Sequence, residues 1–216
     1  MSCYYQGCSR PGTNKEHIPP KSFFPKDQRN QLLTVRSCGL HNNEKSSDDI
    51  YVLAQILMNA SPSNRSREVW KQSVLPQLDY SGEALRKTLA SGAIPLPSGA
   101  VRYKVDTARV DGFFNALSCG IVFKACGERL PAQYSIGHVY HNFCDPGETP
   151  EEKEFKNHLR SSHSDEPMAV LDFGRVRALN TSVYSVKVFG IPGFRSSITI
   201  VHDFFGVFRV TSMLTR

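Results

Sequence analysis

The sequence has no long hydrophobic run: no apolar stretch in its 216 residues approaches the roughly 20 residues that a helix needs to span a bilayer. Its first residues, MSCYYQGCSR, contain neither a basic segment followed by an apolar one nor an Arg-rich amphipathic pattern, so no secretory signal or transit sequence is expected. Internal repeats and long low-complexity tracts are also missing. We therefore expect a soluble, cytoplasmic protein that has no contact with membranes.

Acidic residues are in the minority. The 20 Asp and Glu residues face 26 Lys and Arg residues, which gives a formal net charge of +6. This modest positive bias suits a polyanionic partner such as nucleic acid, although many basic proteins bind nothing acidic. The length allows a sizeable hydrophobic core, in one domain or in a small module joined to a larger one.

The six cysteines fall into two groups. Three of them, Cys3, Cys8 and Cys38, lie with His41 near the N-terminus, whereas the other three are scattered downstream. In a chain without an export signal, such cysteines are better interpreted as metal ligands or buried thiols than as a disulfide framework.

The first 45 residues have little with which to build a core, because Gly, Pro and Asn are closely spaced and the apolar runs are short. A segment of this kind usually needs a metal to hold its shape. Cys3 and Cys8 form a C-x4-C pair, and Cys38 and His41 form a C-x2-H pair, a spacing that fits two knuckles closing on one tetrahedral Zn2+. Four protein ligands leave no position for water, so the zinc would be structural. The alternative is ordinary buried cysteines and a surface histidine.

Two further motifs accompany these pairs. Residues 16–21 read E-H-I-P-P-K between the knuckles, and residues 42–45 read N-N-E-K directly after the second knuckle. The series C-x4-C, E-H-I-x-P-K, C-x2-H-N-x2-K resembles the zinc-stapled members of the HNH, or ββα-metal, endonuclease family. The resemblance covers about residues 3–49, under a quarter of the chain.

The resemblance implies an activity and roles for particular residues. It places His17 as the general base that activates water, Glu16 as the acidic ligand of a catalytic Mg2+ or Mn2+, and Asn42 at the family's final His or Asn on the following helix. Such a module grips the backbone of nucleic acid, here expected to be double-stranded DNA, with little base specificity. Small HNH proteins of this form resemble components of bacterial or phage genome conflict.

The residue types suit this chemistry. A neutral imidazole can accept a proton at pH 7, and a carboxylate and an amide oxygen suit Mg2+ better than Zn2+. Neighbouring side chains of a strand point to opposite faces, so Glu16 and His17 can reach one site only at a strand end. Pro19 and Pro20 stop strand pairing just there. Without its flanking motif, His17 would be interpreted as an exposed loop histidine.

The chain departs from the family pattern at one position. Many family members carry an Asn about five residues before the second knuckle, which orients the base, but this sequence has Leu33 there. Either a backbone carbonyl of residues 33–36 orients His17, or activity is weaker than is typical; Asn30 would reach it only through a loop excursion. Only one of Asn42 and Asn43 should face the cation, because they project about 100° apart on a helix.

Several basic residues could meet phosphates, although for any one of them a solvated surface is the simpler interpretation. Lys45 is equally suited to pairing with Asp48 or Asp49. The other candidates around the site are Lys15, Lys21, Lys26, Arg29 and Arg36.

Hydrophobic periodicity predicts an α+β fold, with a helical middle and a C-terminal, mostly antiparallel β-sheet that includes one helix. The resemblance implies that an N-terminal ββα-metal zinc module precedes them. We expect a nuclease module at 1–60 and a second domain of unknown role at 61–216. Helices are predicted at 46–59, 66–77, 81–91, 106–126 and 149–164, and a turn or linker at 93–100. Strands are predicted at 134–143, 168–173, 182–189, 197–204 and 207–212.

Residues 60–216 contain no second chemical motif. His138, His141 and Cys144 have a spacing that suggests a metal site, but in a strand neighbouring members would face opposite sides. The aromatic residues of the predicted C-terminal strands suit a sheet core better than a platform on which bases stack. Arg175, Arg177 and Arg195 are equally suited to phosphate contact and to a solvated surface. The leading hypothesis is a metal-dependent endonuclease; the others are a non-catalytic zinc-stabilised nucleic-acid-binding module and a zinc-stabilised interaction protein with no nucleic-acid role.

Overall fold

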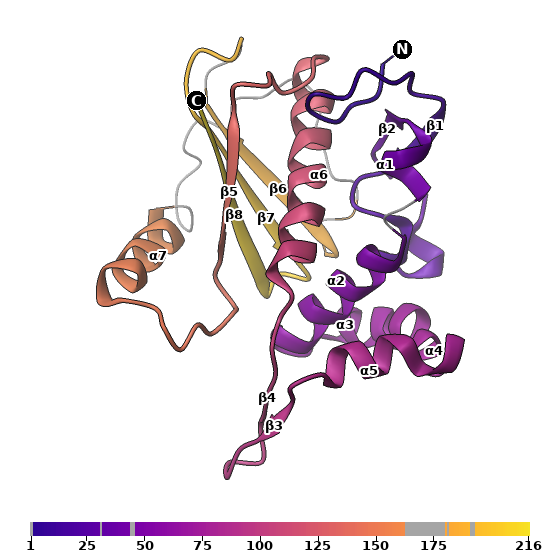
Figure 1. Ribbon diagram of the computed structural model, residues 1–216, viewed down its shortest axis with the longest axis vertical. Helices are drawn as coiled ribbons and strands as arrows, with labels where there is room; N and C mark the ends of the chain where they lie inside the picture. Colours follow the sequence, from indigo (N-terminus) through magenta and orange to yellow (C-terminus); the bar gives the residue numbers. More distant parts are fainter. Residues whose placement is uncertain (1, 31, 44–45, 163–179, 181, 191–192) are drawn as a thin grey trace.

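The computed structural model describes residues 2–30, 32–43, 46–162, 180, 182–190 and 193–216 of the chain. In Figure 1 a small two-stranded ribbon, a group of helices and a four-stranded sheet surround one long central helix. The expected mixed α+β class with antiparallel sheets is confirmed at this level. Among the described residues, no helix combines the length and the apolar character needed to cross a membrane.

The N-terminal ribbon pairs β1 (Asn14–His17) with β2 (Thr34–Ser37) in antiparallel register, and α1 (Gly39–Asn43) follows at once. The connection between the strands contains two 3-10 turns, Lys21–Phe23 and Lys26–Gln28, each preceded by a proline. Proline cannot donate to a strand ladder, so pairing stops after β1. His17 consequently lies at the very end of its strand, opposite Thr34.

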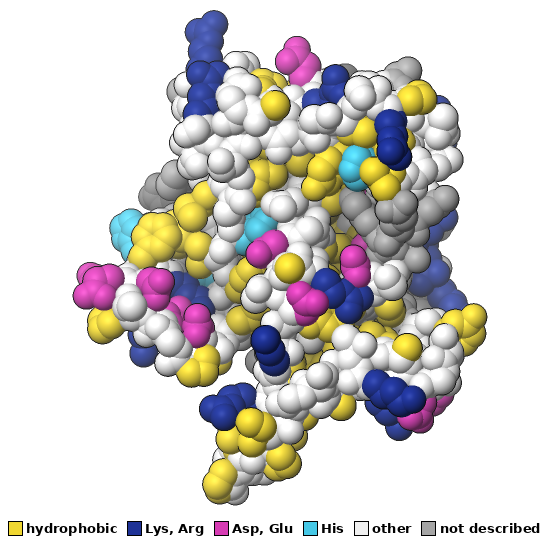
Figure 2. All heavy atoms as spheres, in the orientation of Figure 1, with side chains coloured by type: hydrophobic (Ala, Val, Ile, Leu, Met, Phe, Trp, Pro, Cys, Tyr) yellow, Lys and Arg dark blue, Asp and Glu magenta, His cyan; other side chains and the backbone are white. Residues whose placement is uncertain are grey.

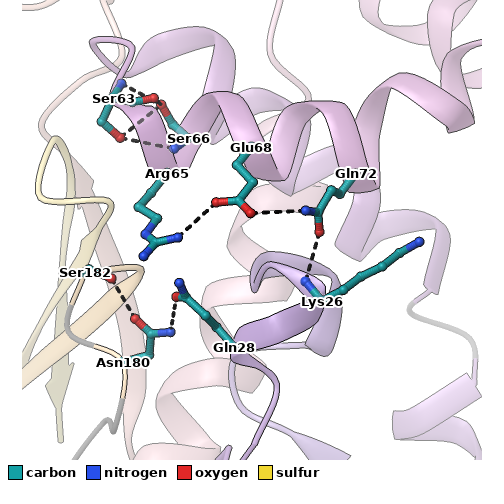
Figure 3. Close-up of polar contacts among 9 residues, drawn as sticks. All are labelled: Lys26, Gln28, Ser63, Arg65, Ser66, Glu68, Gln72, Asn180 and Ser182. Atoms are coloured by element: carbon teal, nitrogen blue, oxygen red, sulfur yellow. Dashed lines mark hydrogen bonds and ion pairs between the residues drawn. The ribbon is translucent and has the colours of Figure 1, made fainter.

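The helices begin and end where local sequence signals place them. Ser63 and Ser66 form a reciprocal capping box at the start of α3 (Figure 3), and the Asp106 carboxylate accepts a hydrogen bond from the Arg109 backbone N–H at the start of α6. Gly127, at a φ of 74°, ends α6 because glycine adopts this left-handed conformation readily. The helices are α2 (Ser46–Asn59), α3 (Asn64–Val69), α4 (Leu75–Leu78), α5 (Ala84–Ala90), α6 (Thr107–Cys126) and α7 (Pro150–Ser162), with a π-helical stretch at Trp70–Val74.

The main sheet is antiparallel, with the strand order β5-β8-β7-β6. Its strands are β5 (Ser135–Tyr140), β6 (Tyr184–Phe189), β7 (Ile198–Phe204) and β8 (Phe208–Thr215). The long helix α6 lies across one face of this sheet (Figure 1). A separate hairpin of β3 (Ile94–Pro95) and β4 (Val101–Arg102) projects away from the body of the molecule.

The predicted elements largely coincide with the observed ones. Each predicted helix has a counterpart, and the strands predicted at 134–143, 182–189, 197–204 and 207–212 appear as β5, β6, β7 and β8. Residues 93–100 do turn, but their flanks also pair as β3 and β4. The strand predicted at 168–173, with Arg175 and Arg177, lies outside the described residues.

One hydrophobic core joins the N-terminal segment to the sheet through α6. The Phe23 ring stacks on Phe113 of α6, with ring centroids 5.2 Å apart, and meets Phe204 of β7 at 5.5 Å. Gly120 lets α6 approach the end of β1, since an added Cβ would lie 3.0 Å from the Ile18 side chain. The wall behind His17 is therefore built from α6.

The division into domains at residue 60 stays a prediction.

Polar contacts also tie the loop between β1 and β2 to the π-helical stretch that follows α3 (Figure 3). The Lys26 backbone N–H donates to the Gln72 side chain at 2.9 Å, and Gln72 in turn donates to Glu68 at 3.2 Å. The side-chain amides of Gln28 and Asn180 are in contact at 2.5 Å. These contacts hold the loop that follows His17 against both the π-helical stretch and Asn180, which precedes β6.

A chain of hydrogen bonds is buried between α6 and the sheet. His138 contacts Asn115 through Nε2 at 3.0 Å and Ser212 through Nδ1 at 2.9 Å. His202 contacts the same Ser212 hydroxyl through Nε2 at 3.1 Å and the Tyr184 hydroxyl through Nδ1 at 2.8 Å. Burial lowers the pKa of His138 to about 4 and that of His202 to about 3, so both rings are neutral at pH 7.

Candidate metal centre and active site

Three cysteines and one histidine meet beside α1. The ligand atoms of Cys3, Cys8, Cys38 and His41 all lie within 4.8 Å of one another. The Nδ1 atom of His41 is 3.4 Å from the Cys3 sulfur and 3.3 Å from the Cys38 sulfur, and the sulfurs of Cys8 and Cys38 are 3.9 Å apart. The spacing of the two pairs in the sequence therefore corresponds to one cluster that can hold a metal ion.

The fold positions each ligand through nearby backbone contacts. The loop that carries Cys3 is held against β2, because the Tyr4 N–H donates to the Arg36 carbonyl at 2.9 Å. Cys38 lies between the end of β2 and the start of α1, and the ring of His41 stacks on Tyr5 with centroids 4.2 Å apart. Burial opposes ionisation of Cys38, but the backbone amide of His41 and the neighbouring thiols outweigh it and lower the pKa of Cys38.

The donor set fits a zinc ion. Tetrahedral ligands at about 2.3 Å for sulfur and about 2.0 Å for nitrogen lie about 3.8 Å (S to S) and about 3.5 Å (S to N) apart. The 3.9 Å between Cys8 and Cys38 and the 3.3–3.4 Å contacts of His41 match these spacings. Thiolates and imidazole are also the ligands that distinguish zinc from Mg2+ or Ca2+.

The other possible metal set does not come together. His138 contacts Ser212 and His141 contacts Thr211, which are successive residues of β8 and so lie on opposite faces of the sheet. Cys144 is exposed. Within the described part of the chain, only the cluster of Cys3, Cys8, Cys38 and His41 meets the geometry of a metal site.

His17 borders a small cavity at the end of β1. The cavity has a volume of about 10 Å³, enough for one water molecule, and is lined by Tyr4, Glu16, His17 and Asp49. Apolar side chains of α6 complete its wall, among them Phe113, Ala116 and Leu117. Glu16 and His17, which alternate in a strand, thus border one space where the strand ends.

The His17 ring is half-buried and its pKa is lowered. Burial has the largest effect, and the charges of Lys21 and Lys15 lower the pKa further. The backbone carbonyls of Leu33 and Arg36 are bound by the N–H groups of Ile18 and Tyr4. Among the described residues, the His17 ring makes no hydrogen bond. No group is therefore seen to fill the orienting role of the absent asparagine.

The structure places Asp49, rather than Asn42, at this cavity. Asn42 lies on α1 and is not among the cavity's lining residues. Asp48 and Asp49 both lie in the first turn of α2, where acidic residues are common for electrostatic reasons alone. Asp48 forms an ion pair with Arg109 of α6 at 2.7 Å, whereas Asp49 faces the cavity. Sequence reasoning missed Asp49 because only the packing of α2 shows which carboxylate turns inward.

Basic residues share the ribbon face that carries His17. Lys15 and His17 alternate with Glu16 in β1, and Lys15 lies directly opposite Arg36 of β2. Lys15, Arg36 and Lys124 line a hollow of about 350 Å³ beside the ribbon. Two like charges directly opposite each other destabilise a strand pair, so an anion bound across them would offset the repulsion.

Comparisons with known proteins gave no match: no family model, no curated protein and no solved structure is similar to the chain at a significant level.

Proposed function

We propose that this protein is a metal-dependent endonuclease of the HNH type that hydrolyses phosphodiester bonds of double-stranded DNA, with a structural Zn2+ held by Cys3, Cys8, Cys38 and His41. The observation that carries the proposal is the position of His17. It borders a water-sized cavity together with two carboxylates, Glu16 and Asp49, and shares a ribbon face with Lys15. The sequence resemblance over residues 3–49 supplies the reaction type, and a role in bacterial or phage genome conflict rests on it alone.

In this proposal the side chains of the site have different roles in hydrolysis. His17, neutral at pH 7, takes a proton from water while the water oxygen forms a bond to phosphorus and the bond from phosphorus to the 3′ oxygen breaks. The leaving 3′ oxygen takes up a proton from solvent and becomes a hydroxyl.

Glu16 and Asp49, which line the same cavity, would hold the Mg2+ or Mn2+ ion, and the ion would supply positive charge that stabilises the phosphate in the transition state. The resemblance assigns a ligand role to Asn42 as well, but Asn42 does not line this cavity. Lys15 and Arg36 hold neighbouring phosphates of the DNA backbone.

Plasmid cleavage in the presence of Mg2+ or Mn2+ tests the catalytic role. His17→Ala is expected to lower the cleavage rate on the order of 100-fold or more, because it removes the general base. His158→Ala is the matched control, since His158 is exposed on α7 and should leave the rate unchanged. An inactive parent protein, or a His17→Ala variant as fast as the parent, would contradict the proposal.

The second candidate function is DNA binding without cleavage. It is favoured by the His17 ring, which has no hydrogen-bond partner among the described residues to orient it. Binding of DNA at low salt without any cleavage would support this function. Absence of both binding and cleavage would leave the role of a zinc-stabilised interaction protein.

Asp49 is expected to assist at the same cavity as Glu16. Asp49→Asn should slow cleavage on the order of tenfold or more and raise the Mn2+ concentration needed for half-maximal rate, since a carboxylate binds the hard cation better than an amide does. Asp48→Asn is the control, because the neighbouring Asp48 pairs with Arg109 instead. Equal rates and equal Mn2+ requirements in the two variants would exclude a role for Asp49.

A further inference from the structure

A second, larger hollow lies at the N-terminal end of α6 and has no part in the proposed nuclease site. It is a groove of about 780 Å³ between the β3–β4 hairpin, β5 and α7. Figure 2 shows hydrophobic and basic side chains on the hairpin and a mixture of acidic and basic side chains on α7. A volume of this size falls within the roughly 300–1,000 Å³ range of small-molecule sites.

Aromatic side chains line the groove from three elements. Tyr103 follows β4, Tyr140 ends β5, and Phe155 lies on α7 with 48% of its surface exposed. Tyr140 packs against Phe143 with ring centroids 5.1 Å apart, so these two rings form one continuous surface. Such surfaces favour a planar ring, since nucleic-acid bases stack on aromatic side chains with little dependence on which base is present.

The acidic residues of the groove are already bound to nearby groups. Glu148 forms an ion pair with Lys156 at 3.2 Å. Asp145 accepts a hydrogen bond from the Gly147 N–H at 2.8 Å. Glu152 accepts one from the Thr149 N–H, also at 2.8 Å, so each carboxylate has a local partner.

The basic residues on the side of the groove formed by the β3–β4 hairpin, called the hairpin wall below, have no such partner in the described part of the chain. Arg102 and Lys104 line the groove and are exposed, and neither has an acidic partner among the described residues. Arg102 ends β4 and Lys104 follows two residues later, and both side chains line the same groove. Arg102 and Lys104 therefore place positive charge on the hairpin wall, whereas the acidic residues of the groove come from the loop before α7 and from α7 itself. The hairpin wall is where a phosphate would be attracted.

We propose that this groove binds a nucleoside phosphate, with the base against Tyr140, Phe143 and Phe155 and the phosphate at Arg102 and Lys104. This ligand combines the planar ring that the aromatic surface favours with the anion that the hairpin wall favours. The site is separate from the His17 cavity, and the two share no lining residue. The same chemistry is present in a free mononucleotide and at the end of a single nucleic-acid strand.

Calorimetric titration of the full chain with AMP tests the proposal, without added Mg2+ or Mn2+ so that no cleavage is possible. AMP should bind with one molecule per chain, and adenosine and inorganic phosphate should each bind at least tenfold more weakly. The variant R102E/K104E should weaken AMP binding at least tenfold. The variant F155A should weaken it severalfold; all three residues are exposed, so circular dichroism should show an unchanged fold.

The matched control is R67E/K71E, which makes the same change in charge at exposed residues outside the groove and should alter AMP binding less than twofold. No AMP binding at millimolar concentration, equal effects of the two double variants, or equal affinity for phosphate and AMP would overturn the proposal. A single-stranded pentanucleotide that binds more than tenfold tighter than AMP would support it with a nucleic-acid strand as the source. Equal affinities would support it with a free nucleotide. Because no cleavage is measured, the result does not depend on the nuclease proposal.

Discussion

Replacing Cys38 with serine is expected to remove the metal from the chain and to lower its thermal unfolding midpoint by on the order of 10 °C. The Cys38 sulfur lies close enough to the Cys8 sulfur and to the His41 ring to share one metal ion with them. Loss of this sulfur leaves the tetrahedral ligand set incomplete. Structural zinc in small peptides is worth about 10–16 kcal/mol of apparent folding free energy. Here the smaller expected loss, several kcal/mol, reflects the packing of Tyr4 and Phe23 into the common core, which persists without the metal.

The measurement is the zinc content of the purified protein together with its thermal unfolding. The parent should contain one zinc per chain, and a chelator should lower its unfolding midpoint as the substitution does. Cys144→Ser is the matched control, because Cys144 is an exposed cysteine outside the cluster. A parent protein without zinc, or a Cys38→Ser variant that retains it, would rule out the metal centre.

Acidification from pH 7 to pH 5 is expected to lower the free energy of unfolding by about 3–4 kcal/mol through His138 and His202 alone. Both histidines have a folded-state pKa well below the ordinary value of 6.5, about 4 and about 3 respectively. Between pH 6.5 and pH 4 the unfolded chain therefore binds protons that the folded chain does not. The resulting stability is present above pH 6.5 and is lost progressively as the pH falls toward 4.

Urea unfolding of the variant His202→Gln at both pH values measures this contribution. Glutamine does not titrate, so the variant should lose about half of the His-dependent change, roughly 2 kcal/mol, whatever its stability at pH 7. His158→Gln is the control, because this exposed histidine of α7 lies outside the buried chain of hydrogen bonds. The same pH dependence in His202→Gln and in the parent would show that His202 does not titrate in this way.

The positions of the helices could be predicted from the sequence because their signals are local. The apolar residues of α2 repeat at helical spacing after two aspartates, and Asp106 and Gly127 mark the two ends of α6. Strand positions followed from runs of β-branched and aromatic residues. The pairing order β5-β8-β7-β6 was not predictable in the same way, because it joins segments distant in the sequence.

The metal cluster was also predictable, since its ligands are confined to two short motifs whose spacing reflects coordination geometry. The sequence by itself determined Cys3, Cys8, Cys38 and His41 as one group. The side chains around His17 were only partly predictable. Glu16 is its neighbour in the chain, but Asp49 comes from α2 and was indistinguishable from Asp48 until the packing of α2 against α6 turned the two carboxylates in different directions.

Only the tertiary structure decided the features that depend on long-range packing. The buried chain of hydrogen bonds from Asn115 to Tyr184 needs α6 to pack on the sheet and needs all four strands of the sheet to pair. The groove needs the β3–β4 hairpin, β5 and α7 to meet. Helix caps and metal motifs are encoded within a few residues because the groups that interact are neighbours in the chain. The neutral state of His202 and the uncompensated charge of Arg102 and Lys104 depend instead on which distant groups surround them, and the linear sequence carries no direct signal of that.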